Sequence, residues 1–316
     1  MKPVEKLESR LDNRVYLPAT GSWPNAYHLF QKRPARALIA ALSAGRPLLV
    51  RGEPGVGKSQ LARAAAAVLE WPFISTVIQP NTEYQELLWV FDHTQRLGDA
   101  QLAGAIGTNG LVKDTDQYVS PGPLWYALNW VDAAKDGRNR QNYRPPADVD
   151  PPTEEQGVVL LIDEIDKADI SVANGLLEVL GNGRFDVQTT GETVCAGGKP
   201  PLVVLTSNDT RELPAAMVRR CVVLDIKLPD SGDELIRHLM DIGRAHFADV
   251  DEAICREAAE DIVADRERCH ELPRTGQAEY LDLLRALNEV AKGDANGQRS
   301  WLHKLRRYFQ KSHAHR

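Results

Sequence analysis

One eight-residue segment, 52–59, constrains the fold of this 316-residue chain more than any other feature. Its sequence is Gly-Glu-Pro-Gly-Val-Gly-Lys-Ser, and it stands between a short apolar run, 47–50, and an Ala-rich helical pattern, 60–69. A strand, a glycine-rich turn and a helix in this order form a phosphate-binding loop, in which backbone N–H groups face phosphate oxygens. We refer to residues 52–59 as the P-loop. The predicted nucleotide-binding residues are Gly52, Pro54, Gly55, Val56, Gly57, Lys58, Ser59 and Gln60.

Two residues of the P-loop have side chains suited to a bound triphosphate. Lys58 is expected to reach the outer phosphates, and the hydroxyl of Ser59 is expected to ligate magnesium. About a hundred residues further on, a second apolar run ends in the acids Asp163 and Glu164. Together the two motifs predict a chain that binds ATP with Mg²⁺ and hydrolyses it, with Ser59 and Asp163 as the metal-binding residues.

The composition limits the class of protein. The formal charge is 38 − 44 = −6, so the chain lacks the basic balance of a protein that coats nucleic acid. The four cysteines include no C-x-x-C pair, which argues against a disulfide framework or a zinc site and favours a reducing cytoplasm. No apolar run is long enough for a membrane span, and the charged N-terminus has no signal-peptide pattern.

Short apolar runs separated by helical patterns indicate the fold class. The runs are 47–50, 73–78, 158–162, 202–206 and 222–226, and a helical pattern begins at Tyr27. They predict an α/β fold, a parallel sheet sandwiched by helices, with ligands at the carboxyl ends of the strands. Beyond the break at 228–232 the pattern is helical over 234–247, 252–263 and 277–291, which predicts a smaller all-α domain. The expected units are an N-terminal extension 1–24, a nucleotide-binding domain 25–228, a helical lid 229–298 and a basic tail 299–316.

An ordered series of segments resembles the MoxR-like branch of the AAA+ ATPases over residues 25–290. The series comprises 163–168 after the acidic strand, a helix ending at 176–180, a hairpin at 183–187 and 191–195, the strand end 204–209, the arginine-bearing segment 213–221 and the lid segment 272–275. The resemblance implies a P-loop AAA+ fold, ATP hydrolysis with Mg²⁺ and assembly into a ring of identical subunits, six in number. It also implies a protein client or effector, with a partner bearing a von Willebrand A domain as the first candidate.

The resemblance also implies roles for single residues. Glu164 would polarise the attacking water, Asn208 would help to place it, and Arg274 would contact the nucleotide from the lid as sensor 2. Arg220 would act as an arginine finger on the γ-phosphate of the neighbouring subunit, and the adjacent Arg219 is the alternative for that role. Glu164, Asn208 and Arg220 are therefore the predicted catalytic residues.

Two segments leave alternatives open. Residues 81–122 correspond to an insert of this branch that would face a pore or a partner, or their Trp89 and Phe91 would simply pack on the core. The last 25 residues carry seven Lys or Arg against one Asp. As a helix this tail would either dock on the lid through Trp301, Leu305 and Tyr308, or bind nucleic acid or an acidic partner.

The favoured function is therefore ATP-driven remodelling or activation of a protein partner by a cytoplasmic ring. The first alternative is a nucleic-acid-translocating or restriction-type motor subunit, which the acidic charge of residues 1–291 disfavours. The second is an ATP-dependent assembly switch with little turnover, which the presence of Glu164 disfavours.

Overall fold

A five-stranded parallel sheet forms the centre of the molecule. The structure is a computed structural model that describes residues 2–106, 112–268 and 274–311. The strand order is β11-β3-β10-β7-β4, and all neighbours are parallel. The strands are β3 (Leu48–Gly52), β4 (Phe73–Val77), β7 (Val159–Asp163), β10 (Leu202–Ser207) and β11 (Val222–Ile226), so all five predicted runs are strands of one sheet.

Both faces of the sheet are covered, because successive apolar residues of each strand point to opposite sides. Leu48 and Val50 pack on one face with helices α1, α2 and α3, while Leu49 packs on the other with α4, α6, α7, α8 and α9. The covering helices are α1 (Pro3–Glu8), α2 (Lys32–Ala44), α3 (Lys58–Leu69), α4 (Tyr84–Leu88), α6 (Pro123–Leu128), α7 (Trp130–Ala133), α8 (Ile170–Asn182) and α9 (Ala215–Arg220). The predicted α/β sandwich is confirmed.

The N-terminal residues pack as part of this body. Strand β1 (Arg14–Leu17) pairs antiparallel with β2 (Ala26–Leu29), so one hairpin spans the expected boundary at residue 24. Leu7 and Leu17 are buried against α2 and α3. The helical pattern expected from Tyr27 is wrong at its start, because residues 26–29 are a strand in this hairpin and the helix α2 begins at Lys32.

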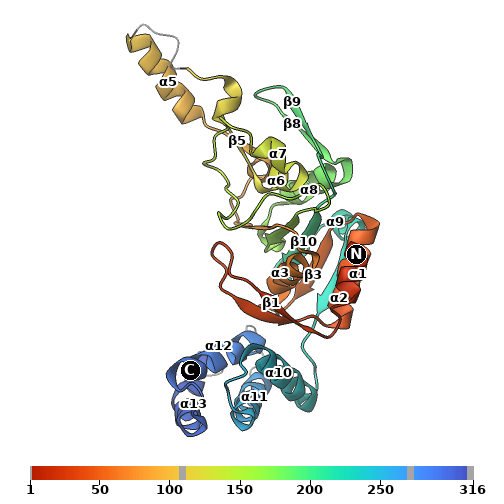
Figure 1. The fold of residues 1–316 in the computed structure, drawn as a ribbon, viewed down its shortest axis with the longest axis vertical. Coiled ribbons are helices and arrows are strands. Elements are labelled where there is room, and N and C mark those ends of the chain that lie inside the picture. The colour runs from red at the N-terminus through yellow and green to blue at the C-terminus, as the bar shows by residue number, and fades with distance from the viewer. Residues whose placement is uncertain (1, 107–111, 269–273, 312–316) are drawn as a thin grey trace.

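An insert projects from one end of the body (Figure 1). It consists of β5 (Trp89–Phe91), α5 (His93–Ile106), the 3-10 helix η2 (Thr115–Tyr118) and β6 (Val119–Pro121), with β5 and β6 paired antiparallel. Trp89 and Phe91 are buried in the main core, so these two aromatics pack as the simpler alternative predicted. A second hairpin, β8 (Arg184–Val187) with β9 (Glu192–Cys195), confirms the one predicted before β10, and a 3-10 helix, η3 (Ile165–Lys167), follows β7.

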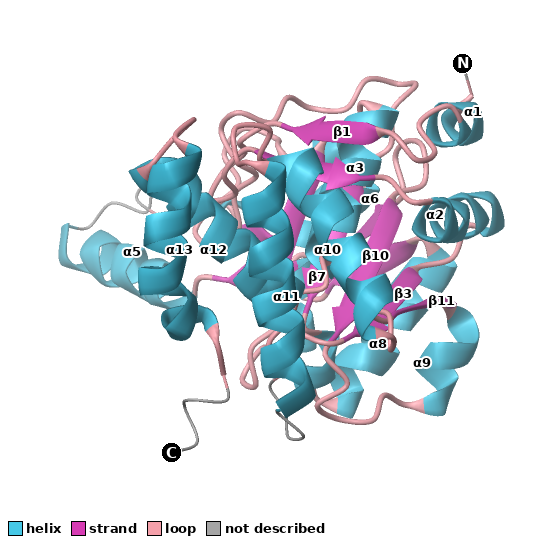
Figure 2. Ribbon diagram, turned by 90° about the horizontal axis from the view of Figure 1, so that it is seen from below, coloured by secondary structure: helices cyan, strands magenta, loops and turns pink. Residues whose placement is uncertain are grey.

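Four helices form the opposite end of the molecule, and we call them the lid helices. They are α10 (Gly232–His246), α11 (Glu252–Arg268), α12 (Gln277–Val290) and α13 (Ala295–Phe309), and they share a separate apolar core. Figure 1 shows them below the sheet, and Figure 2, seen from that end, shows them in front of it. None of the helices within the described ranges is long and apolar enough to cross a membrane.

The tail docks on the lid by a different face from the one expected. Gln298 and Leu302 of α13 are fully buried and Leu305 packs against the lid core, whereas Trp301 and Tyr308 are exposed. Gln298 accounts for this orientation, because its side chain accepts from the N–H of Asp251 at 3.0 Å and donates to the carbonyl of Asp249 at 3.0 Å. The prediction of Trp301 and Tyr308 as anchors is therefore wrong.

Candidate nucleotide site

Three strand ends bring the predicted site residues together. In the order β3-β10-β7, the carboxyl ends of neighbouring parallel strands meet at one edge of the sheet. The P-loop begins at the last residue of β3, Asn208 follows β10, Asp163 ends β7 and Glu164 follows it. We call this group the strand-end site.

The P-loop has the backbone that only glycine adopts readily. Gly52, Gly55 and Gly57 have φ values of 151°, 80° and 88°, in the region that disfavours residues with a Cβ. Gly57 directly precedes α3, whose N-terminal N–H groups and dipole attract an anion. The loop therefore has the conformation and the field of a phosphate site.

Lys58 lies at the centre of the site and is only 6% exposed. Its Nζ donates to the carbonyls of Gly52 and Glu53 at 2.8 Å each and to Oδ1 of Asn208 at 2.7 Å. Burial lowers the pKa of Lys58 from its ordinary value, against nearby carboxylates led by Asp163 that raise it. The ammonium group thus faces the loop and the second strand end at once.

Ser59 and Asp163 are placed to share a hard cation. The Ser59 hydroxyl donates to Oδ2 of Asp163 at 2.8 Å. A hydroxyl and a carboxylate fit magnesium, which takes few protein oxygens and completes its shell with water and phosphate. Within the described ranges, no group of three or more His, Cys, Asp or Glu could hold a metal ion.

Glu164 is held between two donors. Its Oε1 accepts from Nδ2 of Asn208 at 3.3 Å and its Oε2 from Nζ of Lys167 at 2.6 Å. Its backbone is left-handed, with φ of 60°, which is uncommon for a residue with a Cβ and typical of strained functional positions. Asn208 therefore bridges Lys58 and Glu164, as a residue that places a reacting water would.

Three residues that the sequence reasoning missed support this arrangement. Thr206 donates to Asp163 and accepts from the Glu164 N–H at 3.1 Å, and Lys167 pairs with Glu164. Asp166, almost fully buried, accepts from the Asn208 N–H at 3.3 Å and from Thr210. Burial alone would raise the pKa of Asp166, but the hydrogen bonds from Thr210 and Asn208 outweigh it and keep that pKa below its ordinary value.

The three predicted arginines are exposed in the single chain. Arg219 and Arg220 are exposed in the last turn of α9, and neither forms an ion pair within the described residues. Arg274 is exposed ahead of α12, and its neighbours Leu272 and Pro273 lie outside the described residues. A different lid residue, Arg266 of α11, reaches the P-loop and pairs with Glu53 at 2.8 Å.

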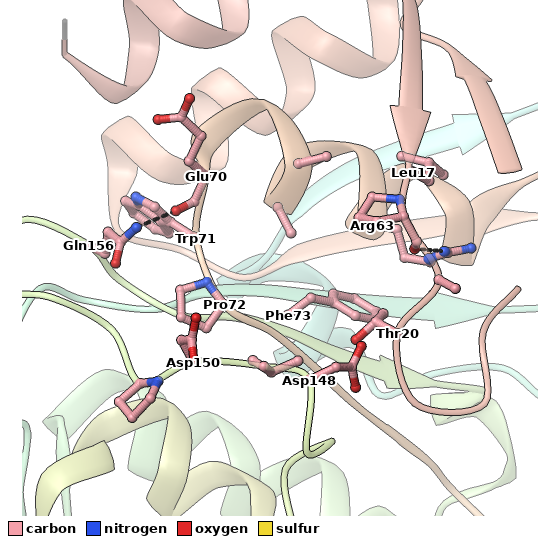
Figure 3. Close-up of a pocket in the computed structure, with 16 residues that line it drawn as sticks. Leu17, Thr20, Arg63, Glu70, Trp71, Pro72, Phe73, Asp148, Asp150 and Gln156 are labelled. Carbon is pink, nitrogen blue, oxygen red and sulfur yellow. Dashed lines mark hydrogen bonds between the residues drawn. The ribbon is translucent and has the colours of Figure 1, made fainter. Parts of the chain in front are cut away.

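Two cavities lie along α3. A crevice of about 80 Å³ adjoins the P-loop and is lined by Val56, Gly57, the hairpin residue His28 and the lid residues His238 and Gln277, among others. A larger cavity of about 460 Å³ lies toward the other end of α3, between Arg63, Trp71 and Asp148, and no predicted site residue lines it (Figure 3). The crevice is thus the cavity that belongs to the strand-end site.

The fold and the site define the class of protein. A parallel sheet in which the P-loop strand β3 lies between β11 and the central strand β10, an Asp-Glu pair two strands away and C-terminal helices are the features of an ATPase of the AAA+ type. A family model described as AAA domain (dynein-related subfamily) matches residues 47–221, more than half of the chain. The chain belongs to this family, binds nucleotide and is an ATPase.

Other comparisons add less. No curated protein matches the chain. Two RuvB mutants from Thermotoga maritima are similar at 18% and 16% identity, with TM-scores of 0.47 and 0.48, each over 87% of this chain and 68% of the other. A putative ATPase from Cytophaga hutchinsonii is similar at 15% identity and a TM-score of 0.39, over 83% and 74%. These likenesses do not bear on what the chain acts on.

Proposed function

We propose that this chain is a ring-forming, MoxR-like AAA+ ATPase that hydrolyses ATP with Mg²⁺ and remodels or activates a protein partner. The observation that carries the proposal is the position of Asn208, which contacts Lys58 and Glu164 at once while Ser59 contacts Asp163. A protein that only bound ATP would need the P-loop but not a carboxylate held beside it. The contacts therefore support ATP turnover over ATP binding alone.

The proposed roles follow from the contacts. Lys58 would exchange its present acceptors for phosphate oxygens, and Ser59 with Asp163 would hold Mg²⁺, which would supply charge neutralisation. Glu164 accepts the hydrogen bond of the attacking water, and Asn208 fixes the position of that water. The remaining nucleotide contacts would come from Gly52, Pro54, Gly55, Val56, Gly57 and Gln60, and the adjacent crevice would take the base.

Ring assembly is proposed from the exposed arginines. Arg220 lies in the last turn of α9, outside the strand-end site of its own chain. A cation that acts in trans must be exposed in the single subunit, so this placement suits an arginine finger directed at a neighbour in a six-membered ring. Arg219 stays the alternative, and Arg274 is proposed as a nucleotide contact from the lid helices.

The insert is proposed as the contact for the partner. On α5 the side chains of Leu97, Leu102 and Ile106 are 60%, 56% and 64% exposed, whereas Ala103 is buried. Apolar side chains this exposed on a projecting helix suit contact with another protein. A protein with a von Willebrand A domain is the first candidate.

The proposed units remain the extension 1–24, the nucleotide-binding domain 25–228, the lid 229–298 and the tail 299–316.

The ion pairs of the tail favour a protein partner over nucleic acid as the binding target of this chain. Arg299 pairs with Glu257 at 3.4 Å, Arg306 with Asp261 at 3.2 Å and Lys311 with Glu279 at 3.6 Å. Lid carboxylates therefore already neutralise much of the positive charge that phosphates would need.

A trapped complex tests the proposal. The variant Glu164→Gln should bind ATP without turning it over, so a client should stay bound to it and co-purify in the presence of ATP. Lys58→Ala, which should not bind ATP, is the matched control. Recovery of nucleic acid in place of protein at moderate salt would favour the motor alternative over this proposal.

A further inference from the structure

An ion pair joins the lid helices to the P-loop. Nη2 of Arg266, on α11, lies 2.8 Å from both Oε1 and Oε2 of Glu53, the second residue of the P-loop. Nη1 of Arg266 donates to the carbonyl of Thr275 at 3.2 Å, just ahead of α12. The Arg266 side chain is 13% exposed and that of Glu53 is 37% exposed, so the pair is partly shielded from water. Charge-assisted contacts of this kind are stronger than ordinary surface pairs.

Glu53 is connected to the nucleotide lysine by its own backbone. Its carbonyl accepts from Nζ of Lys58 at 2.8 Å, while its carboxylate accepts from Arg266. One residue of the P-loop therefore contacts both the lysine and the lid.

A second part of the lid, the start of α12, also lies against the P-loop. A Cβ built on Gly55 would lie 2.6 Å from the Cβ of Ala278, and one on Gly57 would lie 3.5 Å from Nε2 of Gln277. Gln277 and Ala278 begin α12, so the N-terminus of that helix lies against the loop. Gln277 also contacts His238 at 3.3 Å, and both line the crevice beside the P-loop.

Buried contacts fix the part of the lid that carries Arg266. The neighbouring Asp265 is 1% exposed and accepts from the hydroxyl of Thr275, which is fully buried. The N–H of Lys311, beyond α13, donates to Asp265 at 2.8 Å and to the Thr275 hydroxyl at 3.0 Å. Arg266 therefore extends from a part of the lid that buried hydrogen bonds hold in place.

We propose that Glu53 and Arg266 are a pair of positioning residues that hold the lid on the P-loop and thereby set the affinity for the nucleotide. The inference rests on the proposed nucleotide site and adds two residues to it, neither of which touches the reacting atoms. The pair keeps the walls of the crevice together, so a bound nucleotide leaves more slowly. Its loss raises the Kd for ADP and the KM for ATP and changes kcat less.

The direction in which Glu53→Gln changes ADP affinity distinguishes this positioning role from a direct electrostatic effect of Glu53 on the phosphates. Removing a negative charge beside phosphates would by itself strengthen nucleotide binding. If the pair holds the lid, Glu53→Gln instead weakens ADP binding about tenfold, as expected when one partner of a shielded ion pair is lost. Isothermal titration calorimetry with Mg-ADP and steady-state ATP turnover measure both quantities.

A charge exchange completes the test. Glu53→Arg and Arg266→Glu each weaken ADP binding alone, and the double variant recovers at least part of the loss. The matched control is Arg306→Ala, because Arg306 of α13 contacts both oxygens of Asp261 on the same helix α11, 3.2 Å from each, without contacting the P-loop. It should leave the Kd for ADP unchanged.

The outcomes are distinct. Tighter ADP binding by Glu53→Gln, absence of recovery in the double variant, or an equal loss in Arg306→Ala would overturn the proposed positioning role. Binding of ADP by Lys58→Ala with wild-type affinity would instead overturn the nucleotide site itself. Thermal unfolding of each variant checks that the chain is folded.

Discussion

The strand-end site and the insert are built in opposite ways. At the strand ends, hydrogen bonds join Lys58 to Asn208 and join both Ser59 and Thr206 to Asp163, and all of these bonds are partly buried. On α5 of the insert, Ala103 is buried while three large apolar side chains face solvent. The first region is held by hydrogen bonds among its own side chains, whereas the second leaves large apolar side chains exposed.

This difference matches two tasks of the proposed function, ATP hydrolysis and contact with a partner. Catalysis needs groups held in one geometry, because misplaced charges stabilise a transition state poorly. Contact with varied partners tolerates, and can use, a segment with little packing of its own. We therefore expect substitutions at the strand ends to change turnover and substitutions on α5 to change partner binding.

Arg220 is the largest expected exception to this comparison. Its side chain is exposed, like those of α5, but its loss should lower ATP turnover. Arg220→Ala is expected to lower ATP turnover about a thousandfold, the scale of an arginine finger. Mixing it with Glu164→Gln subunits, whose arginine is intact, should restore part of the activity in a phosphate-release assay. If mixing never restores turnover, or if Arg219→Ala is the variant that abolishes it, the assignment to Arg220 is wrong.

The base and the tip of the insert should differ in stability. Trp89 is 3% exposed, and Trp89→Ala should lower the free energy of unfolding by about 3–5 kcal/mol. Leu102→Ala, on an exposed side chain, should change it by about 0.5 kcal/mol or less. Chemical denaturation measures both. Equal losses would mean that α5 is packed more tightly than its exposure indicates.

Substitution of Thr206 tests whether an uncharged residue of the strand-end site contributes to kcat. Its hydroxyl contacts Asp163 and the N–H of Glu164, and hydrogen bonds to charged groups contribute about 1.5–3 kcal/mol. Thr206→Val should therefore lower kcat about tenfold to a hundredfold, while Thr206→Ser should keep most of it. Unchanged kcat in the valine variant would show that Asp163 and Glu164 are placed without it.

The smallest effect on turnover is expected on α5. A variant with Leu97, Leu102 and Ile106 all changed to Ser should keep basal ATP turnover and unfolding temperature, because these side chains pack little in the single chain. Recovery of the client on Glu164→Gln carrying these changes should fall. A matched variant with Val290→Ser, exposed on α12, should recover the client normally.

The sequence was most informative where a motif is local. The P-loop, the acidic strand end and all five sheet strands could be predicted because glycine geometry and apolar runs act over a few neighbouring residues. The pairing of Thr206 with Asp163 could not, because it depends on the register that aligns β10 with β7. Glu53 and Arg266, 213 residues apart, meet only in the folded chain.

The tail shows a second limit. The tail helix has an amphipathic pattern in which the aromatics Trp301 and Tyr308 look like anchors. Burial instead follows Gln298 and Leu302, because a polar side chain can be buried when the partner offers hydrogen bonds that the sequence alone does not reveal.

The central claim is that Glu164 carries hydrolysis at a site that binds ATP independently of it. The most direct measurement compares ATP affinity by calorimetry and single-turnover hydrolysis in the wild type and in Glu164→Gln. We predict similar affinity and a rate lowered by at least about a hundredfold, the scale of a lost general base. Hydrolysis by Glu164→Gln at close to the wild-type rate would contradict the account.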